Sequence, residues 1–272
     1  MSTTADAPEA SFHVTSRDGT AIAVWVGGEG PPIVLVHGSF TDHTAWAATL
    51  PELRRHFSTF AVDRRGFGAS GDEASYDIAR EFEDIAMVVE TVAQRSEALV
   101  TVWGHSFGAN CTMGGAALSS SVGHLILYEP SLGLHHAPGA IESAEEALVQ
   151  GDHEDVVQRM LFDVLEMSDE DIAAMKTGPR WPLILGGART VVREARVEHG
   201  WVYEPGQFET ITASTLFVSG DDSTDSVRAA TERAAAAIPG SRIHVLEGHG
   251  HFAHRTDPGL VVDLIRDFVR ST

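Results

Sequence analysis

Short apolar runs alternate with amphipathic segments along most of this chain. The runs occupy residues 33–36, 59–62, 99–103, 124–128, 215–219 and 242–246. An apolar run of this length is typical of a strand that is buried on both faces. Between the runs, apolar residues at helical spacing predict helices near 44–56, 77–95, 226–238 and 259–270. Buried strands that alternate with helices predict a parallel sheet with right-handed crossover connections.

Two further strands are predicted near the N-terminus. The segments 12–15 and 21–26 flank Asp18 and Gly19, and an Asp-Gly pair supplies the positive-φ turn of a hairpin. Together with the six buried runs, this hairpin predicts an α/β fold with a mostly parallel central sheet of about eight strands, flanked by helices.

One long segment interrupts the alternation. No strong strand pattern occurs from about 135 to 210, where helical patterns at 141–150, 153–166 and 169–175 are separated by prolines and glycines. The segment lies between two predicted strands, so we interpret it as a helical cap inserted after strand 6, over the strand ends. We therefore expect a core made of residues 1–134 and 211–272 and a cap made of residues 135–210.

Composition limits the partners of this chain. Its 272 residues include 19 Lys and Arg against 39 Asp and Glu, a formal net charge of −20. Such a charge repels nucleic acid and anionic membranes, so we expect a small-molecule substrate instead. Cys111 is the single cysteine, which excludes an intramolecular disulfide and a multi-thiolate metal site. The first residues lack the pattern of a signal peptide, so a cytoplasmic location is expected, and a homodimer is compatible with the sequence.

The most informative motif is Gly-His-Ser-Phe-Gly at 104–108, directly after the apolar run 99–103. Small residues follow it at helical spacing. A G-x-S-x-G sequence between a strand and a helix places its serine on a sharp turn at the edge of a sheet. The amides at the start of the next helix can then stabilise negative charge beside Ser106.

Polar residues follow the other strands at the same predicted edge. They are His37-Gly38-Ser39-Phe40, Asp63 to Ser70, Glu129-Pro130, Gly220-Asp221-Asp222-Ser223 and Gly248-His249-Gly250-His251-Phe252. Functional groups collect at the carboxyl ends of the strands in an open parallel sheet. A serine, several carboxylates and a histidine thus share one edge.

In these motifs and their order the chain resembles the α/β-hydrolase family, over nearly its whole length apart from the cap. The resemblance implies that Ser106 is the nucleophile and His251 the general base. It also implies that the backbone amides of Ser39 and Phe107 form an oxyanion hole.

The acid of this triad is left open by the sequence. Glu129 ends an apolar strand, where a carboxylate between Tyr128 and Pro130 needs a partner such as His251. Asp222 is the alternative, one residue short of the position after Gly220 where the family often has its acid. Asp221 and Asp225 are less favoured candidates.

The expected reaction is acyl transfer to water. The substrate would be a small to medium, largely apolar carboxylic ester, lactone or thioester. Alternatives are a ligand-binding receptor or a non-hydrolytic member of the family, such as a cyclase or perhydrolase, or a C–C bond hydrolase. We expect no cofactor, because the chain has no dinucleotide G-x-G-x-x-G after its first parallel strand and no P-loop. We expect no metal, because the histidines near the C-terminus lack the spacing of a helical metal motif.

Overall fold

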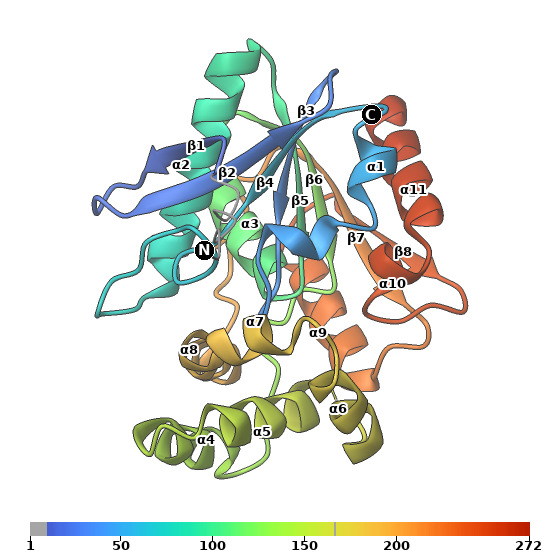
Figure 1. Ribbon diagram of the computed structural model, residues 1–272. Coiled ribbons are helices and arrows are strands. Elements are labelled where there is room, and N and C mark those ends of the chain that lie inside the picture. The colour runs from blue at the N-terminus through green and yellow to red at the C-terminus, as the bar shows by residue number, and fades with distance from the viewer. Residues whose placement is uncertain (1–9, 166) are drawn as a thin grey trace.

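The computed structural model describes residues 10–165 and 167–272. Within these residues the strands form a single eight-stranded sheet (Figure 1). Its members are β1 (Phe12–Thr15), β2 (Ala21–Gly27), β3 (Pro32–Val36), β4 (Ser58–Val62), β5 (Val100–His105), β6 (Val122–Tyr128), β7 (Ser214–Gly220) and β8 (Arg242–Leu246).

The strand order is β1-β2-β4-β3-β5-β6-β7-β8. The hairpin β1–β2 is antiparallel and joins β4 in antiparallel fashion, whereas every neighbouring pair from β4 to β8 is parallel. The prediction of a mostly parallel sheet of about eight strands is confirmed. All carboxyl ends of the parallel strands therefore lie at one edge, where the candidate residues collect.

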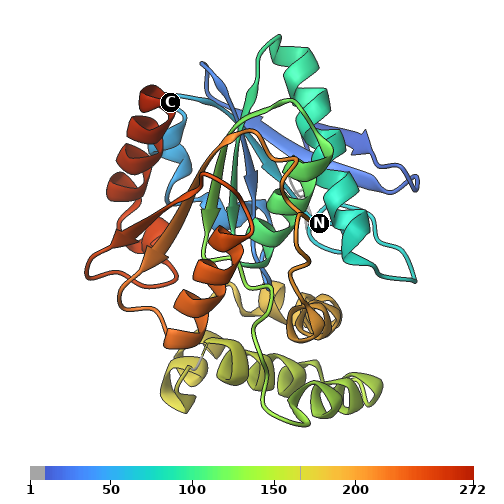
Figure 2. The same cartoon turned by 180° about the vertical axis from the view of Figure 1, so that it is seen from behind.

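Helices cover both faces of the sheet. Those of the main body are α1 (Leu50–Leu53), α2 (Ile78–Ser96), α3 (Phe107–Leu118), α9 (Asp225–Ala236), α10 (Ala253–Thr256) and α11 (Pro258–Ser271). Figure 2 brings α2, α3 and α9 to the front, and α1 and α11 lie on the opposite face.

The side chains of β3 show how one strand serves both cores. Val34 and Val36 pack into the core beneath α2 and α3, whereas Ile33 and Leu35 pack into the core beneath α1 and α11. Successive side chains of a strand point to opposite faces, so an all-apolar run is what a doubly covered strand requires.

The segment between β6 and β7 is helical in its described part. It contains α4 (Ala140–Val149), α5 (His153–Leu165), α6 (Asp169–Lys176), α7 (Trp181–Gly186) and α8 (Ala188–Gly200). These helices lie together beyond one end of the sheet (Figure 1), and their apolar faces form a separate cluster that includes Met160, Trp181 and Val191. We call this segment the cap. The division of the chain into two domains stays a prediction, and residue 166, the predicted end of the helix beginning at 153, lies outside the described residues.

Two helical predictions differ from the structure. The segment 44–56 is not one helix: a 3-10 turn, η1 (His43–Trp46), is followed by the short helix α1. The Asp42 side chain caps η1, and Pro51 lies at the start of α1, where proline is favoured because its missing amide costs nothing. The second difference is that α7 and α8 were not predicted as distinct helices. Pro182 at the start of α7 and glycines around 187 obscured their periodicity.

Candidate active site

Ser106 lies on a strained turn between β5 and α3. Its φ and ψ are 54° and −128°, a region that side-chain-bearing residues rarely adopt. The flanking glycines make the turn possible. A Cβ at Gly108 would lie 2.2 Å from the carbonyl oxygen of His37, and one at Gly104 would lie 2.6 Å from the Cα of Ala109. Close backbone packing therefore presents the Ser106 side chain at the edge of the sheet.

His251 contacts Glu129 at the same edge. Nδ1 of His251 lies 2.6 Å from Oε2 of Glu129, which follows directly after β6. The loop that carries His251 crosses the end of β7 to reach this carboxylate. Gly220 permits the crossing, because a Cβ there would lie 2.1 Å from the carbonyl oxygen of His249. Tyr128 also holds the loop, since its hydroxyl donates to the carbonyl oxygen of Gly250.

Both oxygens of the Glu129 carboxylate have polar partners. Its Oε1 accepts hydrogen bonds from the amide of Gly220 at 2.7 Å and the hydroxyl of Ser223 at 2.6 Å. Burial by itself favours the neutral acid, but the hydrogen bond and charge of His251, with the Gly220 and Ser223 donors, outweigh it and lower the pKa of Glu129. Glu129 is thus a buried carboxylate aimed at the imidazole.

The other candidate acids lie elsewhere. The side chain of Asp222 is exposed, and its backbone amide donates to the carbonyl oxygen of His249 at 3.0 Å. Oδ1 of Asp221 accepts from the amide of Gly248 at 2.7 Å, and Asp225 pairs with Arg228. Within the described residues, Glu129 is the predicted acid that the structure brings to His251. Ser223, in the family's usual acid position, instead donates to Glu129.

The two predicted oxyanion-hole residues flank Ser106. Phe107 is the first residue of α3, so its amide belongs to the turn, and Ser39 follows Gly38 in the loop after β3. The loop approaches the serine closely, because a Cβ at Gly38 would lie 2.9 Å from the Cβ of Ser106. His37 is fully buried and accepts a hydrogen bond from the amide of Arg64 at 3.0 Å, which fixes this loop in place.

Ser106 and His251 line one cavity beneath the cap. The space that the centres of water molecules can reach inside it has a volume of about 90 Å³. This is enough room for several waters or one small molecule. Ser39, Phe40, His105 and Phe252 from the main body line it, with a cap side formed by Leu161, Met175, Arg180, Ile184, Val191 and Glu198.

A second imidazole, His105, supports the loop of His251. Its Nε2 lies 2.8 Å from the carbonyl oxygen of His251, and its ring lies 4.5 Å from the His251 ring between centroids. Burial first, and then the repulsion that protonated His254 and His251 rings would exert, lower the pKa of His105 well below its usual value. His105 is therefore a neutral positioning group. Its place beside Ser106 in the motif was the sequence signal for it.

A buried ionic cluster lies beside the loop after β3. Arg64 is 1% exposed and pairs with Glu81 of α2 and Glu194 of α8, and its guanidinium also donates to the carbonyl oxygen of Gly38 at 3.2 Å. Burial, and then repulsion from Glu81, raise the pKa of Glu194, which the charge of Arg64 opposes. Arg64 of the segment 63–70 thus connects the cap to the loop that carries Ser39.

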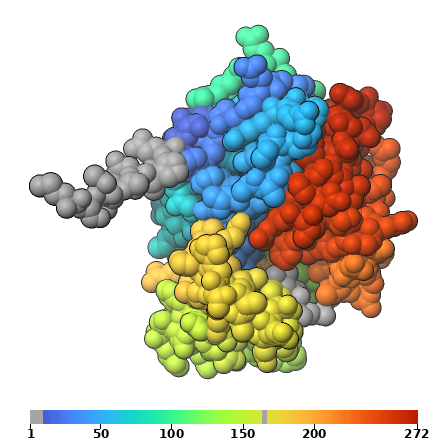
Figure 3. All heavy atoms as spheres, turned by 45° about the vertical axis from the view of Figure 1, so that its right-hand side comes forward, coloured from blue at the N-terminus to red at the C-terminus, as the bar shows by residue number. Residues whose placement is uncertain are grey.

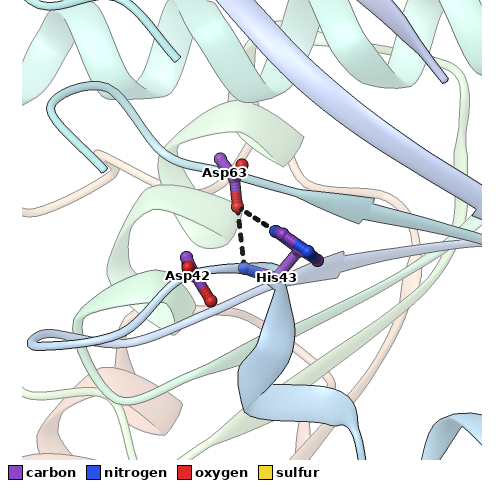
Figure 4. A group of neighbouring side chains, drawn as sticks. All are labelled: Asp42, His43 and Asp63. Carbon is purple, nitrogen blue, oxygen red and sulfur yellow. Dashed lines mark hydrogen bonds and ion pairs between the residues drawn. The ribbon is translucent and has the colours of Figure 1, made fainter. Parts of the chain in front are cut away.

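Asp42, His43 and Asp63 form a compact group with the composition of a metal site (Figure 4). The Asp63 carboxylate already accepts from the amide and Nδ1 of His43 at 2.7 and 2.8 Å, and from Trp25 at 2.9 Å. Oδ1 of Asp42 accepts from Thr44. Both oxygens of Asp63 and Oδ1 of Asp42 therefore already have donors within the protein, and the group supports the loop after β3 through hydrogen bonds.

Comparisons with known proteins agree with this architecture. The profile described as "Alpha/beta hydrolase family" matches residues 33–264. An alpha/beta hydrolase from Sphaerobacter thermophilus is 27% identical, with a TM-score of 0.82 over 94% of this chain and 99% of that one. The (E)-2-((N-methylformamido)methylene)succinate hydrolase of Acinetobacter baylyi is 26% identical over 90% of this chain and 92% of its own length. The enol-lactonase of Burkholderia xenovorans shares the fold at 19% identity, with a TM-score of 0.72 over 95% of this chain and 99% of that one.

The described helices are each too short or too polar to cross a bilayer. The sheet order, the strained serine turn and the profile match over most of the chain all lead to one assignment. The chain belongs to the alpha/beta hydrolase family.

Proposed function

We propose that this protein is a serine hydrolase that cleaves a small to medium carboxylic ester, lactone or thioester through an acyl-enzyme. The observation that carries the proposal is the 2.6 Å contact between Nδ1 of His251 and Glu129, beside a cavity that Ser106 also lines. A serine hydroxyl is a weak nucleophile unless an oriented base accepts its proton.

The proposed reaction proceeds in two halves. Oγ of Ser106 attacks the carbonyl carbon while Nε2 of His251 takes the hydroxyl proton, and Glu129 stabilises the resulting imidazolium. The amides of Ser39 and Phe107 hold the oxyanion. The tetrahedral intermediate then expels the alkoxide or thiolate, which receives the proton from His251. Water attacks the acyl-enzyme in the same way, releasing the acid and restoring Ser106.

Part of the cavity wall suits an apolar segment of the acyl group. Leu161, Ile184 and Val191 of the cap face it, together with Phe40 of the loop after β3. We propose that the cap, predicted as residues 135–210, excludes bulk water from the acyl-enzyme. Two curated relatives are named as hydrolases of methylene-succinate derivatives, so such compounds belong among the substrates to be tested.

The proposal is tested by active-site labelling and turnover. A fluorophosphonate should label the wild-type protein at Ser106, which mass spectrometry of the labelled peptide locates, and Ser106→Ala should not be labelled. A panel of short-chain esters, lactones and thioesters should then show turnover that Ser106→Ala lacks. Cys111 is the internal control, because it is fully buried and should not react.

The possible outcomes of this labelling and turnover experiment lead to different conclusions. Labelling at Ser106 with multiple turnovers supports the hydrolase. Labelling followed by negligible turnover across the panel favours the alternative of a ligand-binding or non-hydrolytic member of the family. The absence of labelling at Ser106 refutes an activated serine, and with it the proposed mechanism.

A further inference from the structure

Two arginines line the cavity that contains Ser106. Arg180 precedes α7 in the cap, and Arg255 belongs to α10, four residues after His251. Figure 3 shows α6 and α7 (yellow) beside the C-terminal part of the chain (red), from which these two side chains come. Cations from two separate segments therefore meet at one cavity.

Neither arginine has an acidic partner among the described residues. The guanidinium of Arg180 donates to the hydroxyl of Thr41 at 2.7 Å, and that of Arg255 lies 5.5 Å from the ring centroid of Phe252. Arg180 is half-buried and Arg255 is exposed, whereas the buried arginines Arg64 and Arg65 are paired with carboxylates. Two arginines without an acidic partner therefore line the same cavity.

The two guanidiniums also repel one another. Partial burial, and then the charge of Arg180, lower the pKa of Arg255. Like charges held close to one another without a counter-ion are unfavourable, and a bound anion would offset this repulsion.

A buried imidazole, that of His254, lines the same cavity and precedes Arg255 in the sequence. His254 is 1% exposed, lines the cavity, and has no hydrogen-bond partner for its Nδ1 within the described residues. Burial, followed by the positive charges of His251, Arg255 and Arg180, lowers the pKa of His254 to about 3. At neutral pH His254 is therefore uncharged, so it can offer a hydrogen bond without adding to the repulsion.

One acidic side chain, Glu198, is found among the described residues that line the cavity. It is 4% exposed, and its Oε2 lies 3.5 Å from Nε2 of His136, so it has a basic neighbour of its own. No ion pair joins Glu198 to either arginine in the described part of the chain. The arginines keep their charge available for a ligand.

We propose that the substrate carries a carboxylate that Arg180 and Arg255 bind together, which makes it a short half-ester or lactone of a dicarboxylic acid. The guanidinium group matches a carboxylate in geometry and can bind it through paired hydrogen bonds. The anchor lies close to the reacting carbonyl, because Thr41, which holds Arg180, is two residues after Ser39. Two residues span at most about 7 Å between their Cα atoms, so we expect the carboxylate and the ester carbonyl to belong to one short substrate. This inference rests on the proposed function for its chemistry and adds the substrate class.

The test compares two substrates of equal shape. Monomethyl glutarate and methyl 4-carbamoylbutanoate differ only in a terminal carboxylate against a carboxamide, and a pH-stat measures the acid released from each. Charge-assisted hydrogen bonds predict a kcat/KM for the carboxylate substrate about 10- to 100-fold above that for the carboxamide. Arg180→Gln and Arg255→Gln should each lower this ratio about tenfold. Arg189→Gln, an exposed arginine on α8, is the matched control and should leave the ratio unchanged.

Binding provides a readout that does not need turnover. Calorimetry of Ser106→Ala with glutarate should detect binding that weakens about tenfold when Arg180→Gln is added and weakens further at high salt. If the fluorophosphonate does not label Ser106 but glutarate binds through the arginines, the hydrolase proposal fails and the anion site stands. If both esters are hydrolysed with equal kcat/KM, and glutarate does not inhibit the wild-type enzyme, the anion site is refuted and the hydrolase stands. These wild-type measurements decide the matter even if an arginine variant does not fold.

Discussion

Replacement of Glu129 by glutamine tests how His251 is oriented. Glutamine keeps the size of the side chain, and its carbonyl oxygen can still accept from Gly220 and Ser223. Its NH2 group then faces Nδ1 of His251, at the place of a carboxylate oxygen 2.6 Å away. A donor facing Nδ1 moves the imidazole proton to Nε2. Nε2 can then no longer accept the proton of Ser106.

The magnitude follows from the charges involved. The imidazolium formed during the reaction loses an opposite charge about 4 Å away, worth about 4 kcal/mol at an effective dielectric constant of 20. Part of this is the hydrogen bond to a charged group, about 1.5–3 kcal/mol, and the wrong tautomer adds to the loss. A total of about 4–6 kcal/mol corresponds to about 10³- to 10⁴-fold in kcat. The equivalent neutralisation in serine proteases costs about 10⁴-fold.

The assay is steady-state turnover of whichever panel ester the wild type hydrolyses best, with the thermal unfolding midpoint as a check on folding. Asp222→Asn is the matched control, because it neutralises an exposed carboxylate on the neighbouring loop, without contact to His251. It should keep the wild-type rate within about twofold. The reasoning is wrong if Asp222→Asn abolishes turnover while Glu129→Gln, still folded, remains nearly as active as the wild type.

Three further predictions concern stability and accessibility. The pKa values of His37 and His254 are lowered by burial to about 4 and about 3, below the usual 6.5, so the unfolded chain binds more protons than the folded one as the pH falls below 6.5. Denaturant unfolding should show a stability loss of up to about 3 kcal/mol per pH unit between pH 6 and pH 5 from these two groups, and a flat profile would contradict their neutral burial. Gly108→Ala forces a Cβ to within 2.2 Å of a backbone oxygen and should lower stability by more than about 3 kcal/mol, whereas Gly200→Ala, with open space around its Cβ, should not; equal melting temperatures would disprove the close approach. Cys111 is fully buried and burial raises the pKa of its thiol, so an aromatic disulfide reagent should react only after unfolding, and rapid reaction of the native protein would overturn this placement.

The positions of Ser106 and Glu129 show what the sequence could predict. Both follow apolar runs, and parallel strands bring their carboxyl ends to one edge, so this edge was predictable without any contact information. Which of Glu129 and Asp222 contacts His251 was not predictable. It depends on the register of β6 against β7 and on the loop of His251 crossing the end of β7 at Gly220, and neither leaves a local pattern in the sequence.

The arginines of the cavity illustrate the opposite case. Arg180 and Arg255 are ordinary surface residues by sequence, and only the packing of the cap against α10 brings them to one cavity. Helices α7 and α8 were not predicted for a related reason. Their apolar residues pack within the cap, but irregular turns interrupt the helical spacing by which a helix is recognised in a sequence.

The ion pair between Arg64 and Glu194 has a consequence for the route by which a substrate reaches Ser106. If α8 moved away from the main body, the buried charge of Arg64 would lose its partner Glu194. Breaking a buried ion pair in this way costs about 3–5 kcal/mol. The α7 side of the cap has a weaker attachment, a hydrogen bond from Arg180 to the Thr41 hydroxyl. We therefore expect the cap to open at α7 while α8 stays attached, and this would place Arg180, directly before α7, at the opening.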